Sequence, residues 1–569
     1  MITPEVETLK ELVVYIRERY GDRLALQIKG RNGFVRFSYK EVADRAFAIA
    51  GALQELGIKK GDKVAVIGEN RPEWAMSYLG VMASGAIVVP IDPFLKGGEV
   101  AHIVNVAEVS CVIASGKFVP MFEEIRELLH SVKAFITMED EGEEGWYTFP
   151  EIIERGDRVI KSDAFIEYSV SKDDIAAIIF TSGTTGKAKG VMLSHYNIVF
   201  DADSASRVIV IQPTDMAISI LPLHHTFECT AGFIAVILRG GAITYARSLK
   251  PNEIVEDIRD AGVTIMLGVP LLFEKILSGI QRKLREQPAP KRALIGGLMG
   301  MTKGLRKLGF EGAGRVLFKS LREKAGMGRL RIMVSGGAAL RPDVEIAFRE
   351  FGFPILQGYG LTETSPVLTV NPLDKPKVGS VGLPIPGAEI DIHNPDEDGV
   401  GEIIARGPMI MQGYYKDEEE TRKVLKDGWF FTGDLGYIDE DGYLYITGRA
   451  KNVIVSAAGK NIYPEEIERE LLKSPIIEEV LVVGRYNAET KREEVWAIVY
   501  PNFEAIAECE SPDEKECIER VLKEEIRKYC QNLAEYKRVQ AFQVIDEEFP
   551  KTTTRKIKRY LFTDKAVRL

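Results

Sequence analysis

The sequence contains few of the residues from which disulfide scaffolds, metal centres and membrane spans are built. Its 569 residues include five scattered Cys and six His, which excludes a disulfide-stapled domain and a Cys-based zinc site. Unbroken apolar runs such as Ala235–Leu238 fall far short of the ~20 residues of a transmembrane helix. Residues 1–23 have the pattern of an acidic amphipathic helix, not of a signal peptide. We therefore expect a cytoplasmic protein without a transmembrane anchor.

Positive charge is also in deficit. The chain has 74 Lys and Arg against 84 Asp and Glu, a net charge of −10, whereas a nucleic-acid-binding protein is usually basic. Apolar residues make up 45% and charged residues 28%, values typical of a globular protein with a sizeable core. The length predicts several domains, or one large domain with an appendage.

The first half of the chain alternates helical and strand patterns. Residues 38–56 have helical apolar spacing and end at Gly57, and residues 63–68 (KVAVIG) follow as a buried strand. The alternation continues with helices at 73–84 and 99–106 and strands at 86–90 and 111–114. Such alternation predicts an α/β fold whose inner strands are largely parallel.

One basic stretch interrupts this pattern. Residues 282–331 contain 14 Lys and Arg against 3 Asp and Glu, a net charge of about +11 in an acidic protein. It also holds the Gly-rich apolar segment LIGGLMGM, residues 294–301. Two interpretations stay open: a solvated helical insertion, or a surface that contacts anionic lipid or an anionic cofactor.

A second change occurs at residues 428–459, where strand and turn patterns dominate. Beyond it the sequence predicts a helix at 464–474, strands at 477–483 and 493–501, and a helix at 512–532. These elements form a compact α+β module. We place the boundary of this module near residues 449–451.

The strongest local motif is Thr181-Ser182-Gly183-Thr184-Thr185-Gly186-Lys187-Ala188-Lys189-Gly190, which follows a buried strand at 176–180. Its glycines permit close backbone approach to an anion, its hydroxyl and N–H groups donate to phosphate oxygens, and lysine neutralises charge. A Walker A loop requires Gly at position 181 and Ser or Thr at 188, so that reading is rejected. A flexible linker is disfavoured because a strand directly precedes the motif.

Four further motifs follow in order: Gln357-Gly358-Tyr359-Gly360-Leu361-Thr362-Glu363-Thr364, the segment 431–435 (FTGDL), Gly448-Arg449, and the segment 550–556 (PKTTTRK). With these five motifs the chain resembles the adenylate-forming superfamily of acyl-CoA synthetases, peptide-synthetase adenylation domains and luciferases. The resemblance implies an N-terminal domain at 1–448, built of α/β sheets, helices and a β-barrel-like part. It also implies a small, mobile α+β C-terminal domain at 449–569, with a hinge at Lys451.

The resemblance also implies a reaction in two steps that uses ATP, Mg²⁺ and CoA. A carboxylate attacks the α-phosphorus of ATP and releases pyrophosphate, and a thiol then displaces AMP from the acyl-adenylate. Glu363 and Thr181 would hold Mg²⁺, Thr362 would lie near the α-phosphate, and Lys556 would drive adenylation. The implied ATP- and AMP-binding residues are Thr181, Ser182, Gly183, Thr184, Thr185, Gly186, Lys187, Gly336, Gly337, Ala338, Gln357, Gly358, Tyr359, Gly360, Thr362, Asp434, Arg449 and Lys556.

Taken singly, some of these residues could have a purely structural role or be solvated surface charges. Asp434 lies in a turn-rich stretch, Glu363 could begin a helix, and Lys556 lies in a basic tail. Arg555 stands where the family commonly has Gly. Because of this departure, a lipid- or nucleotide-binding protein without turnover remains an alternative, although Lys556, Glu363 and Asp434 together argue against it.

The acid pocket is implied by the segment 221–228 (LPLHHTFE), in which His225 matches the family's pocket-lining histidine; a buried core histidine is the alternative. The implied acid-pocket residues are His225, Glu228, Gly232 and Gly268. Glu228 and the basic insertion resemble long-chain fatty-acid–CoA ligases, so a fatty acid is the first choice. Aryl-, medium- and short-chain acids remain alternatives.

The thiol acceptor is implied by the segment 456–460 (SAAGK), where Gly459 and Lys460 would line the path of the CoA thiol. CoA is favoured, and loading of a separate acyl carrier protein stays open. The expected partners are the acid, ATP and CoA, without nucleic acid. Peripheral contact with an anionic membrane and a homodimer are both left open.

Overall fold

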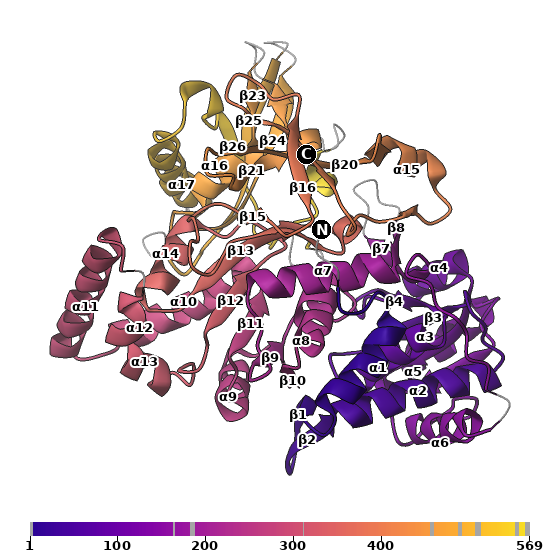
Figure 1. The fold of residues 1–569 in the computed structure, drawn as a ribbon. Helices are drawn as coiled ribbons and strands as arrows, with labels where there is room; N and C mark the ends of the chain where they lie inside the picture. The colour runs from indigo at the N-terminus through magenta and orange to yellow at the C-terminus, as the bar shows by residue number, and fades with distance from the viewer. Residues whose placement is uncertain are drawn as a thin grey trace. The chain divides into compact units, whose positions relative to one another are not determined.

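The computed structural model describes residues 4–162, 165–181, 188–310, 312–455, 460–487, 492–506, 514–551 and 557–563. These residues form two compact units (Figure 1). Unit 1 contains the chain up to residue 390 together with residues 405–430, and unit 2 contains residues 391–404 and the chain from 431 onward. The domain boundary predicted between residues 448 and 449 concerns a mobile C-terminal domain, which a division into compact units does not test. It stays a prediction.

Unit 1 is built on two sheets whose central strands are parallel. In the nine-stranded sheet, β13, β12, β11, β9, β10 and β1 are parallel neighbours, and antiparallel strands occupy both edges. In the seven-stranded sheet, β7, β4, β3, β5 and β6 are parallel and β8 and β18 are antiparallel. The parallel interior expected from the alternating pattern is confirmed.

The strand bounds of the nine-stranded sheet are β1 (Leu24–Gly30), β2 (Gly33–Ser38), β9 (Met216–Ser219), β10 (Ala242–Tyr245), β11 (Ile265–Gly268), β12 (Ile332–Ser335), β13 (Ile355–Gly360), β14 (Val367–Val370) and β15 (Leu383–Pro384). Those of the seven-stranded sheet are β3 (Lys63–Ile67), β4 (Ile87–Pro90), β5 (Val109–Ala114), β6 (Ala134–Thr137), β7 (Ile175–Thr181), β8 (Lys189–Ser194) and β18 (Gly413–Tyr414).

Helices connect and cover these strands, as right-handed crossovers between parallel strands require. The helices of unit 1 are α1 (Leu9–Tyr20), α2 (Tyr39–Glu55), α3 (Pro72–Ala83), α4 (Gly97–Ala107), α5 (Val119–Ile125), α6 (Phe149–Ile160), α7 (His195–Val208), α8 (Ala235–Leu238), α9 (Pro251–Ala261), α10 (Pro270–Arg285), α11 (Ala289–Lys307), α12 (Ala313–Leu317), α13 (Lys319–Lys324), α14 (Pro342–Glu350) and α15 (Glu418–Val424). None of the helices in the described ranges is long and apolar enough to cross a membrane.

The helix α2 shows how local sequence sets an element and its packing. Ser38 and Glu41 form a capping box at its start, which satisfies two N–H groups that the helix leaves open. Its apolar face crosses α6, where a Cβ built on Gly156 would lie 1.6 Å from the Ala48 carbonyl oxygen. Only glycine permits this close crossing, so Gly156 fixes the position of α6 on α2.

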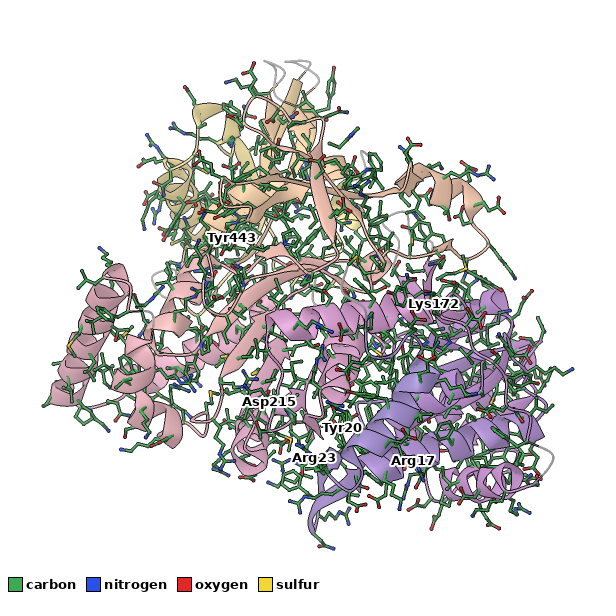
Figure 2. All side chains as sticks on the ribbon, in the orientation of Figure 1. Arg17, Tyr20, Arg23, Lys172, Asp215 and Tyr443 are labelled. Carbon is green, nitrogen blue, oxygen red and sulfur yellow. The ribbon has the colours of Figure 1, made fainter. Side chains whose placement is uncertain are left out.

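Buried polar contacts hold the strands of the nine-stranded sheet in register (Figure 2). Asp215, just before β9, accepts hydrogen bonds from the Thr264 hydroxyl at 2.7 Å and from Nε of Arg331 at 2.8 Å. Because Thr264 precedes β11 and Arg331 precedes β12, one carboxylate joins the beginnings of three neighbouring strands. The Tyr20 hydroxyl of α1 donates to the Leu238 carbonyl of α8 at 2.9 Å, which ties these two helices together.

The strand-rich region between residues 389 and 449 forms a five-stranded sheet in the order β16, β17, β20, β19, with β21 also paired to β20. Its strands are β16 (Glu389–His393), β17 (Gly401–Arg406), β19 (Leu425–Lys426), β20 (Trp429–Ile438) and β21 (Leu444–Arg449). This confirms the strand-and-turn character predicted for the region after residue 428.

Unit 2 also contains the α+β module expected at the end of the chain. A three-stranded sheet of β24 (Ile477–Asn487), β25 (Arg492–Pro501) and β26 (Ala541–Val544) packs with α16 (Pro464–Leu471) and α17 (Glu514–Cys530) around a separate apolar core. The remaining elements are β22 (Ile454–Val455), β23 (Asn461–Ile462) and α18 (Tyr560–Thr563).

Candidate functional site

The Thr/Gly/Lys motif lies between two paired strands of unit 1. β7 ends at Thr181, β8 begins at Lys189, and these two residues are antiparallel partners. The predicted phosphate-binding residues Ser182 to Lys187 lie outside the described residues. Lys189 is bound elsewhere, since its ammonium pairs with Glu420 at 2.5 Å and lies 5.1 Å from the Tyr414 ring centroid.

Glu363 is brought to the same end of unit 1. It lies in the 3₁₀ turn η4 (Thr362–Thr364), which follows β13 of the nine-stranded sheet. The Tyr414 hydroxyl donates to Oε1 of Glu363 at 2.9 Å. Tyr414 lies on β18, which pairs with β8, and the Tyr415 amide donates to the Gly190 carbonyl at 2.7 Å. The first and second motifs in the chain are thus joined through Tyr414, a residue that sequence patterns did not indicate.

The oxygen ligands at this place suit Mg²⁺. The Glu363 carboxylate and the Thr181 hydroxyl are both hard oxygen donors, and magnesium commonly uses one or two carboxylates and completes its shell with water and phosphate oxygens. Among the described side chains there is no group of three or more His, Cys, Asp or Glu that would form an all-protein metal cage. The residues present therefore fit a magnesium ion that is held together with a nucleotide.

Two glycines follow the end of β12, one in close contact with a ring and the other with a positive φ. Gly336 and Gly337 follow β12, and β12 is the parallel neighbour of β13, which carries Tyr359. A Cβ on Gly336 would lie 2.8 Å from the Phe227 ring, and Gly337 has φ of +81°. Ligands of open parallel sheets bind at the carboxyl ends of the strands, and Tyr359 and these glycines lie at such ends. Their contact with adenine stays a prediction.

Gln357 and Gly360 support this edge of the sheet from inside. The Gln357 side chain accepts from the Leu340 amide at 3.0 Å and donates to Glu345 at 2.9 Å, so it holds the segment that follows β12. A direct contact of Gln357 with ATP stays a prediction. A Cβ on Gly360 would lie 1.6 Å from the Pro366 carbonyl oxygen, which explains glycine there, and Gly358 is close to the Thr369 carbonyl.

The expected acid-pocket segment is a π-helix, η3 (Phe227–Ile234), followed by α8. Glu228 is 1% exposed, and burial raises the pKa of its carboxyl to about 8, so it is protonated at neutral pH. Ser219 and the Leu221 backbone bond to this carboxyl, and Oε2 has no hydrogen-bond partner in the described part of the chain. A Cβ on Gly232 would lie 2.9 Å from the same carboxyl group.

The two histidines beside this segment differ. His224 is buried and burial lowers its pKa to about 3, so it is neutral, whereas His225 is only partly buried. Asn70 accepts from the Leu223 amide at 3.0 Å and donates to the Leu221 carbonyl at 2.6 Å, which fixes the approach to both histidines. No sequence pattern marks Asn70. Gly268, at the end of β11, lies against the Phe273 ring, 2.9 Å from where its Cβ would stand.

In unit 2, Asp434 and Arg449 are paired across neighbouring strands. They are register partners on β20 and β21, and Arg449 Nε donates to Asp434 at 2.7 Å. The Asp434 amide donates to Thr432 Oγ1 at 3.1 Å, and Gly433 between them has φ of +71°. A carboxylate oriented in this way can accept from two ribose hydroxyls while the guanidinium remains beside it.

The predicted hinge Lys451 lies in the 3₁₀ turn η5 (Ala450–Asn452), which follows β21. Partial burial of its ammonium, together with the nearby Arg449 and Arg559 guanidiniums, lowers the pKa of Lys451 to about 8. The neighbouring Asn452 amide donates to Glu465 at 2.6 Å, which connects this turn to α16. Of the two predicted CoA-contacting residues, Gly459 lies outside the described ranges, and the Lys460 ammonium lies 5.0 Å from the Tyr536 ring centroid.

Lys556 also lies outside the described residues, but the chain on both sides of residues 552–556 is firmly bound. Lys551 pairs with Glu479 and with Glu548, and it forms a β-bridge with Ile557. Arg559 binds both oxygens of the partly buried Glu468 carboxylate, at 2.7 and 2.8 Å, and donates to the Val482 carbonyl at 2.6 Å. The ends of the segment are therefore fixed to α16 and β24.

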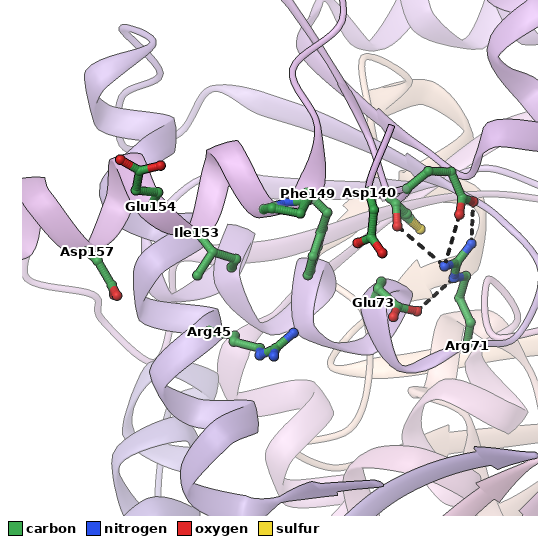
Figure 3. Close-up of a pocket in the computed structure, with 11 residues that line it drawn as sticks. Arg45, Arg71, Glu73, Asp140, Phe149, Ile153, Glu154 and Asp157 are labelled. Atoms are coloured by element: carbon green, nitrogen blue, oxygen red, sulfur yellow. Dashed lines mark hydrogen bonds and ion pairs between the residues drawn. The ribbon is translucent and has the colours of Figure 1, made fainter. Parts of the chain in front are cut away.

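A separate cavity of about 520 Å³ opens between α2, α3 and α6 (Figure 3). Five carboxylates line it against two arginines, Arg45 and Arg71, and Arg71 is already bound to Glu73 and Glu139. This acidic excess is unsuited to a phosphate, and none of the predicted site residues lines the cavity.

Comparison with known proteins agrees with the arrangement of these residues. The AMP-binding enzyme profile matches residues 15–415, and that of the AMP-binding enzyme C-terminal domain matches residues 466–556. The chain belongs to the AMP-binding enzyme family. The resemblance to adenylate-forming enzymes and the mixed α/β fold class are confirmed, and this AMP-binding enzyme uses ATP and Mg²⁺ for adenylate formation.

The enzyme has curated relatives with fatty-acid activities. It is 30% identical to fatty acyl-CoA synthetase B of Dictyostelium discoideum, over 89% of this chain and 78% of the relative. It is 29% identical to a chloroplastic long-chain-fatty-acid–[acyl-carrier-protein] ligase of Arabidopsis thaliana, over 90% and 78%. Among solved structures, anthranilate CoA ligase AuaEII with anthranoyl-AMP has a TM-score of 0.76 at 22% identity, covering 97% of this chain and 96% of that one.

Proposed function

We propose that this AMP-binding enzyme activates long-chain fatty acids with ATP and transfers the acyl group to CoA. The observation that carries the proposal is the state of Glu228. An amino-acid substrate would need an ionised carboxylate to pair with its ammonium group, but burial keeps Glu228 protonated with neutral His224 nearby in the chain. A protonated carboxyl and a neutral imidazole suit an alkyl chain better than an ammonium group, and the fatty-acid ligases among the relatives support this choice.

In the first half-reaction, a carboxylate oxygen bonds to the α-phosphorus of ATP and the bond to pyrophosphate breaks. Two anions must approach each other, so cations and preorganised donors lower the barrier. We assign β- and γ-phosphate binding to residues 181–190, adenine binding to Tyr359 and the 336–338 backbone, and ribose binding to Asp434 with Arg449. Glu363, oriented by Tyr414, would hold the magnesium ion, which neutralises phosphate charge when bound.

In the second half-reaction, the thiol sulfur bonds to the acyl carbonyl carbon and the bond to the AMP phosphate oxygen breaks. We assign the path of the CoA thiol to Gly459 and Lys460, and the first-step cation to Lys556. Thr362 and His225 would contact the α-phosphate region and the acid, and Lys451 would be the hinge between the two steps. These roles rest on the family resemblance and on the surrounding geometry.

Acid-dependent ATP–pyrophosphate exchange tests the substrate class. A panel of saturated acids of increasing length, aryl acids and amino acids is compared at equal concentration. Exchange that rises with chain length and is absent with amino acids is the expected result. Exchange that is fastest with an aryl or amino acid would overturn the proposed substrate.

An acyl carrier protein is the second candidate acceptor, because one relative is named as a ligase for that acceptor. Product analysis with CoA and with a carrier protein bearing phosphopantetheine separates the two. Acyl-CoA as the faster product supports CoA, and acylated carrier protein as the faster product supports the alternative.

A further inference from the structure

The basic insertion contains a helix with two apolar faces. In α11, Ile295, Leu298 and Met299 pack against the apolar core of unit 1, and Thr302 is fully buried. Their spacing of three and four residues defines the inward face. Figure 1 shows α11 at the edge of unit 1, beside α12. This face accounts for how the helix is attached.

A second apolar stripe lies on the exposed side of α11 and continues just beyond its end. Leu294, Met301 and Leu308 are 63%, 47% and 74% exposed. They recur every seven residues, so they lie along one line two helical turns apart. Phe310 and Val316, which follow, are 61% and 77% exposed. Burial against this unit explains none of these five side chains.

Positive charge accompanies the stripe. From residue 289 to 307 the helix has five Lys and Arg and no Asp or Glu. Arg292, Lys303 and Lys307 are all exposed. The helical spacing places them on the flank of α11 opposite the apolar stripe. An exposed helix surface with long apolar side chains on one flank, cations on the other and no acidic residue is typical of helices that lie in the interface of an anionic bilayer.

We propose that α11, with Leu308, Phe310 and Val316 beyond its end, docks this enzyme onto anionic lipid membranes. Leu294, Met301, Leu308, Phe310 and Val316 would enter the headgroup boundary while the lysines and arginines pair with lipid phosphates. The proposal stands on this surface alone and does not depend on the substrate.

Lipid fits this surface better than a second copy of the chain. Two copies of α11 face to face would bring together ten cations and no carboxylate, which disfavours self-association. Glycines 296, 297, 300 and 304 have open space where a Cβ would stand, so the long side chains protrude singly. A bilayer surrounds single protruding chains, whereas a protein interface needs a contiguous, complementary patch.

Co-sedimentation of the full-length enzyme with vesicles tests the proposal. The vesicles contain equal parts of phosphatidylcholine and phosphatidylglycerol, and pure phosphatidylcholine vesicles serve as the neutral comparison. Binding to the anionic vesicles at low salt is expected, with at least about tenfold weaker binding to the neutral ones and at high salt. No binding to anionic vesicles at low salt would overturn the proposal.

Variants separate the apolar and charge contributions. Leu294→Ser with Met301→Ser and Leu308→Ser should weaken vesicle binding by about tenfold or more. Lys303→Gln with Lys307→Gln should weaken it roughly twentyfold, since each cation near the surface contributes about fivefold. The matched controls Leu128→Ser and Lys40→Gln remove an exposed leucine and lysine elsewhere and should leave binding unchanged.

Circular dichroism melting and turnover of a water-soluble acid should be the same in all variants, which shows that each folds. Binding that is insensitive to both α11 variants would contradict the proposal. So would sedimentation velocity showing a dimer that the serine variant dissociates, or binding of an acidic carrier protein in place of the vesicles.

Discussion

At Glu363, one phenol sets the orientation of the carboxylate proposed to bind magnesium. The Tyr414 hydroxyl donates to Oε1 at 2.9 Å, and burial beside this carboxylate raises the pKa of Tyr414. Glu363→Gln should lower pyrophosphate exchange by about a hundredfold or more, because the cation loses an anionic oxygen. Tyr414→Phe should lower it about tenfold, since the ligand loses its support.

The measurement is pyrophosphate exchange as a function of Mg²⁺ concentration. Tyr415→Phe is the matched control, because that hydroxyl bonds weakly to Glu108 at 3.4 Å. If the Glu363→Gln variant exchanged pyrophosphate at the wild-type rate at limiting Mg²⁺, the metal would be bound by other residues.

Glu228 predicts a pH dependence of stability. Its pKa is near 4.5 when exposed and is raised to about 8 by burial, so between these values the unfolded chain releases a proton that the folded chain keeps. The contribution of Glu228 to the free energy of unfolding is therefore present at low pH and is lost as pH rises toward 8. The loss should amount to a few kcal/mol, since one pKa unit corresponds to ~1.4 kcal/mol.

Thermal unfolding between about pH 5 and pH 8 measures this difference against Glu228→Gln, which has no such titration. The wild type should lose stability relative to the variant as pH rises. Parallel curves for the two proteins would show that Glu228 is ionised in the fold.

At the scale of elements, we expect the position of Lys556 to depend on the contacts of Lys551 and Arg559 on either side of residues 552–556. Lys556→Ala should abolish adenylation and spare transfer from a supplied acyl-adenylate, because only the first step needs a cation at the α-phosphate. Glu468→Gln removes the charge that binds Arg559. It should slow adenylation by tenfold to a hundredfold, because residues 552–556 would no longer be positioned correctly.

Single-turnover assays of each half-reaction check this. The control Glu525→Gln breaks an exposed pair with Lys528 on α17 and should change neither step. A Glu468→Gln protein that is slowed equally in both half-reactions would indicate general damage to the unit.

The helices and strands expected between residues 38 and 114 were predicted to within about two residues, because apolar periodicity reports burial along one chain. The expected helix at 38–56 is α2, and the expected strand at 63–68 is β3. The π-helix around Glu228 and the roles of Tyr414 and Asn70 were not predicted. Each depends on contacts between residues far apart in sequence, such as the 51 positions between Glu363 and Tyr414, and no local pattern records these.

For the whole molecule, we predict that unit 2 works in two orientations. Lys556 and the Gly459 segment belong to this one unit, and the two half-reactions need them in turn. Lys451→Pro fixes φ and removes an N–H, so one half-reaction should survive while the other, thioester formation, falls strongly. Lys451→Ala keeps a normal backbone and should retain both steps. Equal retention of both steps by a folded Lys451→Pro enzyme would place the pivot elsewhere.

The most direct test of the central claim is a single-turnover experiment with a long-chain saturated acid, ATP and Mg²⁺, followed by addition of CoA. Mass spectrometry of quenched samples should show acyl-adenylate and pyrophosphate before CoA is added, and acyl-CoA with an equal amount of AMP afterwards. Formation of ADP and phosphate, or an acyl-adenylate that persists unchanged after CoA is added, would contradict the account.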